Sequence, residues 1–168
     1  MADFDLKALY DALDQRRASL DMTWAAATRA INRHATDGRS IATSTIAGLA
    51  KRAVAEGDGV LQMLLWLDRT PESFVPGFVG ADGERYRLRR VADDQVLRWD
   101  TAALYAALDE QRHARGMTWK DVAGEVGGFA PAMLTGLAKG GRAAFPGVMR
   151  IVRWLGQPAS SFTRIALR

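Results

Sequence analysis

Apolar residues recur every three or four positions through most of this chain, which is the spacing of one buried helix face. The second half shows the pattern most clearly, because Leu104 and Leu108 follow Asp100, whose side chain can cap the start of a helix. Thr118 can cap a second helix, and Asp121 stands three positions later, where a capping box has its acid. The pattern therefore predicts a mostly helical chain whose helix starts are marked in the sequence.

Proline and glycine mark the other boundaries in this half. Helices are expected to begin near Pro131, Pro146 and Pro158. The first N–H groups of a helix have no hydrogen-bond partner within it, so proline, which has no N–H, fits at that position. Glycine follows three of the helix ends, as Gly116, Gly140 and Gly156. The second half is therefore predicted to hold five helices. The first half follows the same plan, with helices expected near residues 5–19, 24–33, 42–52, 58–68 and 71–74.

The chain also repeats itself. The tetrapeptide Gly-Leu-Ala-Lys stands at 48–51 and again at 136–139, and the same offset of 88 carries Trp66 onto Trp154. Further upstream, "ALYDALD" and "ALYAALD" are offset by 95, so the first copy has seven additional residues between Trp24 and Ile46. A repeat of this length predicts two related units, which we place at 1–76 and 100–168. The leucine of each tetrapeptide, Leu49 in the first unit and Leu137 in the second, is expected in the core.

The connecting segment, residues 77–99, has two interpretations. Its "RYRLRRV" and "QVLRW" stretches alternate in character on either side of "ADD", which is typical of a β-hairpin. An extended linker is equally compatible with the same residues. The fold class predicted overall is all-α, with two repeated five-helix units joined by this linker or hairpin.

Composition and charge narrow the class of protein. The chain has no cysteine, which excludes disulfides and thiolate metal sites, and it has no run of about 18 apolar residues that could span a membrane. The N-terminus lacks the apolar stretch of a signal peptide, so we expect a cytoplasmic protein. The net charge of +4 is uneven: residues 1–75 carry −1, residues 76–100 carry 0 and residues 101–168 carry +5. A basic second unit favours an anionic partner.

Several residues resemble the helix-turn-helix domains of phage repressors and Cro, the Xre-like or lambda-repressor-like group. Ala123 stands where that family has a small residue between its second and third helices, and Gly127 stands at the turn. Phe129 and Leu134 are spaced five apart at apolar family positions, as are Ile41 and Ile46 in the first copy. The paired layout is also similar to actinobacterial proteins with tandem helix-turn-helix units. Thr28 departs from the pattern, because it replaces the small residue in the first copy.

The resemblance implies that the third helix of each unit enters the DNA major groove. Thr43 and Ser44 would then face base edges in the first copy, and Thr135 is the polar candidate in the second. Six basic side chains are the candidates for phosphate contacts: Arg39, Lys51, Arg52, Lys120, Lys139 and Arg142. For Lys51 and Lys139 a purely solvated charge is an equal alternative.

Trp24 and Trp119 stand where the family often has a glutamine that grips a phosphate. An indole N–H could take over that contact, but we favour an interpretation in which both tryptophans are packing anchors at a helix start.

Two functions remain open from these residues. The first is sequence-specific binding of double-stranded DNA by a transcriptional regulator that uses both units. The second is a protein-interaction or oligomerisation module, in which the polar-poor third helix of the second unit docks on another copy or another protein and DNA binding there is weak or lost. His34 and His113 are isolated and no phosphate loop is present, so we expect neither enzyme activity nor a cofactor or metal.

Overall fold

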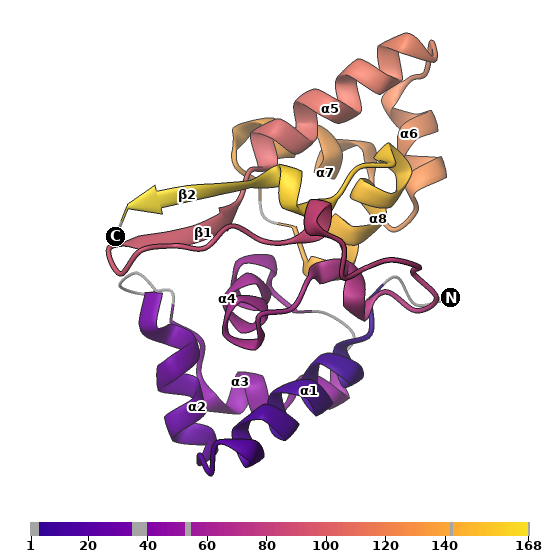
Figure 1. Ribbon diagram of the computed structural model, residues 1–168. Helices are drawn as coiled ribbons and strands as arrows, with labels where there is room; N and C mark the ends of the chain where they lie inside the picture. The colour runs from indigo at the N-terminus through magenta and orange to yellow at the C-terminus, as the bar shows by residue number, and fades with distance from the viewer. Residues whose placement is uncertain (1–3, 35–39, 53–54, 142, 168) are drawn as a thin grey trace.

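A computed structural model describes residues 4–34, 40–52, 55–141 and 143–167 of the protein (Figure 1). Eight α-helices lie within these ranges: α1 (Leu6–Ser19), α2 (Trp24–Ile31), α3 (Thr43–Ala47), α4 (Gly57–Leu67), α5 (Thr101–Ala114), α6 (Trp119–Val126), α7 (Pro131–Gly136) and α8 (Phe145–Leu155). Two strands, β1 (Gln95–Trp99) and β2 (Thr163–Leu167), form an antiparallel pair. Short 3-10 turns join or extend these elements: η1 (Asn32–His34), η2 (Leu49–Lys51), η3 (Pro71–Phe74), η4 (Glu84–Tyr86), η5 (Leu137–Lys139) and η6 (Ala159–Phe162).

Helices α5 and α6 start at the caps that the sequence predicts. Asp100 accepts a hydrogen bond from the Ala103 N–H at 2.9 Å, and Thr118 and Asp121 form a complete capping box at α6. Asp5 caps α1 in the same way through the Ala8 N–H. These side chains satisfy N–H groups that the first turn of a helix leaves without a partner, which is why the local sequence locates the starts.

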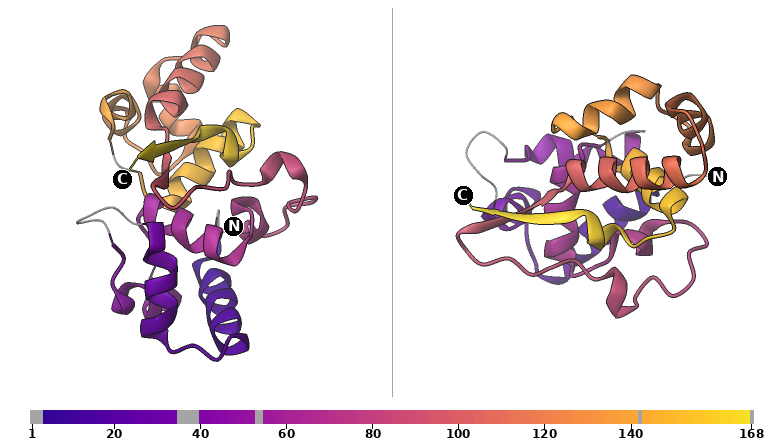
Figure 2. Two further views of the ribbon diagram at one scale, coloured as in Figure 1. Left: turned by 60° about the vertical axis from the view of Figure 1, so that its left-hand side comes forward. Right: turned by 90° about the horizontal axis from the view of Figure 1, so that it is seen from above.

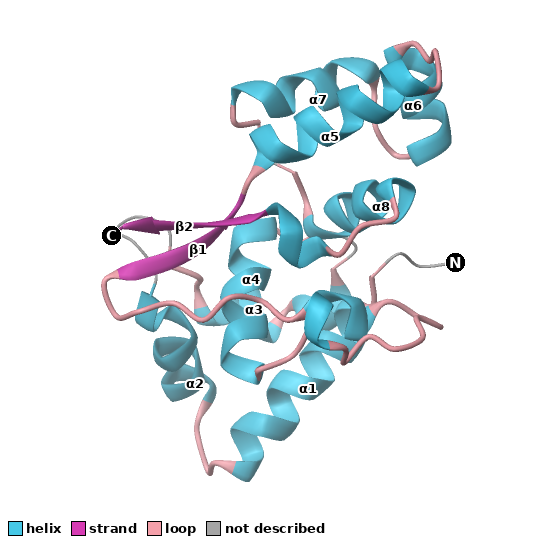
Figure 3. Ribbon diagram, turned by 45° about the horizontal axis from the view of Figure 1, so that its top comes forward, coloured by secondary structure: helices cyan, strands magenta, loops and turns pink. Residues whose placement is uncertain are grey.

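Helix α4 is the central element of the fold. Its residues are apolar around most of its circumference, seven of the eleven are buried, and the other four are half-buried. A helix of this kind needs cover on every side. Figure 3 shows α4 between α1 and α2 on one side and the strand pair on the other.

The strand pair closes the fold at the level of α4. Register places Gln95 opposite Leu167 and Trp99 opposite Thr163. The α4 side chains satisfy further backbone groups of β1: the Gln62 Nε2 donates to the Leu97 carbonyl at 2.9 Å, and Asp58 accepts from the Trp99 N–H at 3.0 Å. The bond between Gln62 and Leu97 is buried. A substitution that removes one partner and leaves the other without a hydrogen bond would therefore lower the free energy of unfolding by about 1–3 kcal/mol.

The two halves of the chain share one hydrophobic core. Phe145, at the start of α8, is fully buried and packs against Phe4 with ring centroids 4.5 Å apart and against Trp99 at 5.5 Å. The Phe145 N–H donates to the Ala55 carbonyl at 2.9 Å. In Figure 1 and in the left view of Figure 2, the α1–α4 part and the α5–α8 part lie on opposite sides of this junction.

The predicted fold class, all-α with two repeated five-helix units, is wrong. The chain is mostly helical but carries a two-stranded sheet, and the segment expected as a fifth helix in each half is a 3-10 turn, η3 or η6. After η6 the chain continues as β2 because the residues Thr163–Leu167 can pair with β1. The boundaries placed at 1–76, 77–99 and 100–168 remain a prediction.

The hairpin interpretation of the connecting segment is also wrong in its pairing. The chain does turn at the expected place, where the Gln95 N–H donates to the Ala92 carbonyl at 3.0 Å. The preceding residues 87–92 are not a strand, since β1 pairs with β2 along one edge and is bonded by Gln62 and Asp58 of α4.

Candidate nucleic-acid interface

In the first half, the candidate surface is α3 with the turn η2 that follows it. Ile46 and Leu49 are fully buried, and η2 packs against α1. Ser44 is exposed and Thr43 half-buried, while Lys51 is exposed at the end of the segment. The segment thus has an apolar inner side that fixes it and an outer side that carries hydroxyl groups and, near its end, a cation. Arg52 is exposed directly after it.

Asn32 positions the entry to α3. Its Nδ2 donates to the Ile41 carbonyl at 2.7 Å, and its Oδ1 accepts from the Ile41 N–H at 2.8 Å. One carboxamide therefore bonds both backbone groups of a residue nine positions later. The predicted contact residue Arg39 lies outside the described residues.

The corresponding surface in the second half is α7. Leu134 and Leu137 are buried, and the turn η5 packs against α5. Gly127 and Gly128 precede α7 with φ values of 77° and 75°, a backbone region that favours glycine. Phe129 packs closely against Gly147, where an added Cβ would stand 2.7 Å from the Phe129 ring.

The outer side of α7 is poor in polar groups. Ala130, Pro131 and Ala132 are exposed, and Met133 is 56% exposed. The hydroxyl group of Thr135 donates to the Ala132 carbonyl at 3.2 Å, so its proton is engaged within the helix.

The predicted cations of the second half are partly described. Lys139 is exposed after α7, and Lys120 is exposed on α6. Arg142, the third predicted cation of this half, lies outside the described residues.

The packing interpretation of the two tryptophans is confirmed. Trp24 stacks on Tyr10 with centroids 5.5 Å apart, and Trp119 stacks on Tyr105 at 5.3 Å. An arginine covers each ring. The Arg17 guanidinium lies 5.0 Å from the Trp24 ring centroid, and the Arg112 guanidinium lies 4.9 Å from the Trp119 ring centroid. Both rings are therefore occupied within the fold.

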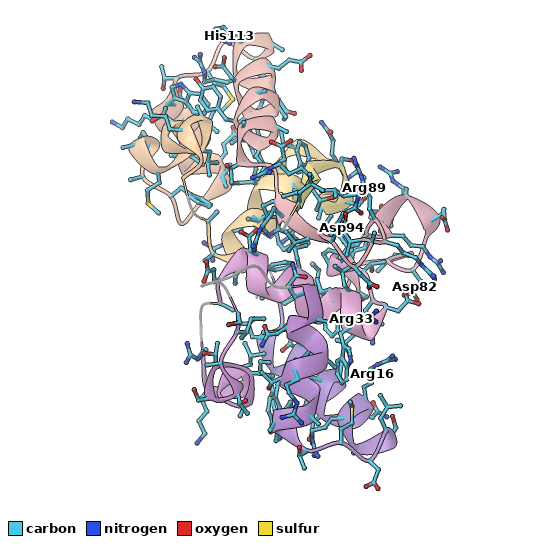
Figure 4. The ribbon with its side chains drawn as sticks, turned by 90° about the vertical axis from the view of Figure 1, so that its left-hand side faces the viewer. Arg16, Arg33, Asp82, Arg89, Asp94 and His113 are labelled. Atoms are coloured by element: carbon cyan, nitrogen blue, oxygen red, sulfur yellow. The ribbon has the colours of Figure 1, made fainter. Side chains whose placement is uncertain are left out.

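A concave, arginine-rich surface elsewhere in the molecule was missed from the sequence. It lies between α2, α4 and residues 82–91, and Figure 4 shows Arg16, Arg33, Asp82 and Arg89 on the same side of the molecule. The run "RYRLRR" is the sequence signal for this surface, but its alternation is also typical of a strand. His113 lies far from this surface, on α5, where its Nδ1 is 2.8 Å from the Asp109 carbonyl oxygen.

No group of three or more His, Cys, Asp or Glu side chains suited to a metal ion occurs in the described ranges. Among the helices the structure describes, none has the length and apolar character to cross a bilayer. Comparisons with protein-family models, with curated proteins and with solved structures gave no match to this chain.

Proposed function

We propose that the protein binds double-stranded DNA sequence-specifically and acts as a transcriptional regulator, with α3 as its principal reading element. The observation that carries the proposal is the two-sided build of residues 43–52. Ile46 and Leu49 hold the segment against the core, while Ser44 and Lys51 remain exposed. Hydroxyl groups can bond base edges in the major groove, and cations at the end of the segment can contact phosphates.

The junction between the halves supports a paired mode of binding. Glu56 forms an isolated antiparallel bridge with Ala144, which stands 88 positions later, at the offset of the sequence repeat. A position that faces its own counterpart is what a local twofold axis produces. Two reading elements related in that way would meet inverted half-sites, as in a repressor dimer.

The experiment is selection from a random duplex pool with the full chain, followed by affinity measurements across a salt series. We expect an enriched motif with inverted half-sites and an affinity that falls steeply with salt. The variant Lys51→Gln/Arg52→Gln should weaken binding and reduce the salt slope by about 0.9 for each lost phosphate contact. Lys7→Gln/Arg164→Gln removes the same charge from other exposed positions and should leave the slope unchanged. No retention at low salt would refute the proposal.

The outer side of α7 favours a second candidate, docking of another protein on the second half. Met133 is exposed beside Ala130, Pro131 and Ala132, with no charged side chain among them. Apolar surface of this kind is more typical of a protein contact than of a phosphate contact. Met133→Lys separates the two: it would abolish a protein complex, whereas it would leave DNA affinity equal or raise it.

A further inference from the structure

The arginine-rich groove between α2, α4 and residues 82–91 has a volume of about 900 Å³. Among the described residues, six arginines line it: Arg16, Arg33, Arg69, Arg87, Arg89 and Arg90. Three described carboxylates also line it, Asp68, Asp82 and Glu84, so the described lining has a formal charge of +3. The whole chain has a net charge of +4, so this one groove holds an excess almost as large as that of the entire protein.

The less exposed lining of the groove, which we call its floor, is mostly apolar, with Gln62 and Thr70 as the polar exceptions. Leu65 and Trp66 of α4 lie half-buried there, and Leu88 and Val91 line it from the connecting segment. The guanidinium of Arg16 lies 5.3 Å from the Trp66 ring centroid, so that cation is held at the edge of the floor by its ring contact. An apolar floor beneath a cationic rim suits a ligand that has both an apolar and an anionic part.

The ion pair between Arg33 and Asp93 can be exchanged at small cost. Arg33 pairs with Asp93 at 2.7 Å, but the two side chains are 67% and 80% exposed. Exposed ion pairs of this kind contribute little to stability. Arg89 and Arg90 are exposed and form no ion pair within the described part of the chain. Guanidinium groups bind phosphate oxygens in pairs of parallel hydrogen bonds, which are stronger than bonds between neutral groups.

The size of the groove selects the class of ligand. Small-molecule sites occupy about 300–1,000 Å³, and this groove lies in the upper part of that range. We propose that the groove binds a nucleoside di- or triphosphate, with the phosphates on Arg33, Arg89 and Arg90 and the base over the apolar floor. The negative charge of such a phosphate chain matches the charge of the groove. The site is separate from α3 and α7, so the proposal stands independently of DNA binding.

Binding would join two parts of the chain that are far apart in sequence. The rim residues Arg89 and Arg90 belong to the connecting segment, whereas Arg33 follows α2. A ligand held by both would fix the connecting segment on the first half. Since this segment leads into β1, which contacts both halves, a bound nucleotide would also stabilise the junction between them.

Isothermal titration of the full chain with ATP, at low salt and without DNA, tests the proposal. We expect saturable binding with a dissociation constant below about 1 mM, weaker binding of pyrophosphate, and weaker binding still of adenosine. Arg89→Gln/Arg90→Gln should weaken ATP binding by about tenfold or more, because it removes two charge-assisted contacts. The control Lys7→Gln/Arg164→Gln removes equal charge outside the groove and should change affinity less than about twofold.

Circular dichroism melts of both variants check that each is folded before titration. Absence of ATP binding to the unmodified chain would overturn the proposal, and so would an equal loss in the two double variants. Binding of a poly-Glu peptide or of a single-stranded oligonucleotide in the groove, with no binding of ATP, would assign the groove to a macromolecular partner and would also overturn it.

Discussion

The Glu72 carboxylate accepts a hydrogen bond from the backbone N–H of Ala159 at 2.7 Å, although the two residues are 87 positions apart. Glu72 is 2% exposed, and its second oxygen, Oε2, is buried without a hydrogen-bond partner among the described residues. The bond ties η3 of the first half to η6 of the second. It places an ionisable group at the junction that the shared core also spans.

Burial raises the pKa of Glu72 above its usual range, and the hydrogen bond from Ala159 and the charge of Arg85 oppose that shift. A carboxyl group whose pKa is raised by folding stabilises the folded state most at low pH, and the contribution is lost as pH rises through the folded pKa. We therefore expect the stability of the unmodified chain relative to Glu72→Gln to increase as pH falls from 7 toward 4.5. Urea unfolding of both proteins at a series of pH values measures this difference in the free energy of unfolding.

Glu125 provides a control with the opposite sign. The pKa of Glu125 is lowered, first by its hydrogen bonds with Arg115 and then by the bond from the Trp154 indole. Its contribution is present at neutral pH and is lost as pH falls through the lowered pKa, so the stability of the unmodified chain relative to Glu125→Gln should decrease toward acid. Parallel trends in the two variants would contradict this assignment.

Local features of the fold were predictable from the sequence, whereas contacts between distant segments were not. Asp100 and Thr118 act within four residues of their own position, so the letters around them suffice to predict a cap. The pairing of β1 with β2 joins residues 64 to 72 positions apart, from Trp99 and Thr163 at one end of the pair to Gln95 and Leu167 at the other. An alternating segment shows that a strand can form, but it does not show which partner it will find.

The candidate site shows the same difference between local features, which the sequence predicts, and contacts between distant segments, which it does not. Leu49 and Leu137 were predicted as core from their helical spacing, and both are buried. The arginine-rich groove was not predicted, because its lining runs from Arg16 to Val91 and exists only when the connecting segment lies against α4. Periodicity reports one face of one element, and a groove between several elements has no signal of that kind.

Asn32 should matter to both stability and DNA binding. Asn32→Ala removes two hydrogen bonds and leaves both backbone groups of Ile41 without them, which should cost about 1–3 kcal/mol in urea unfolding. Because Ile41 lies just ahead of α3, DNA affinity should also fall. Asn32→Asp can still accept from the Ile41 N–H, but its second oxygen would face the Ile41 carbonyl oxygen without a proton to donate, so we expect this variant to lose stability as well. If the Asn32→Ala chain were as stable as the unmodified one, the two hydrogen bonds between Asn32 and Ile41 would be absent in solution.

Phe145 should control the cooperativity of the whole chain. Phe145→Ala removes a fully buried ring from between Phe4 and Trp99, and we expect a loss of about 3–5 kcal/mol. Phe145→Leu keeps more of the volume and should lose less, so it remains measurable if the alanine variant does not fold. Calorimetry should show one transition for the unmodified chain and separated transitions for the variants. Phe78→Ala, at a ring that is 39% exposed, should change stability by less than about 1 kcal/mol.

Two helical glycines should respond to alanine in opposite directions. At Gly57 an added Cβ would stand 2.8 Å from two atoms of the Trp99 ring and 2.9 Å from the Ala143 carbonyl oxygen, at the junction between α4, β1 and the chain before α8. The backbone carbonyl and the buried ring cannot both move away, so Gly57→Ala should destabilise the protein.

At Gly124, inside α6, the same atom would meet nothing within 4 Å. Gly124→Ala should therefore stabilise the protein by about 0.5–1 kcal/mol, because alanine loses less backbone entropy in a helix. Urea unfolding of both variants under one condition measures the difference. A stabilising Gly57→Ala would mean that the two halves do not approach as closely as the contact between Gly57 and Trp99 requires.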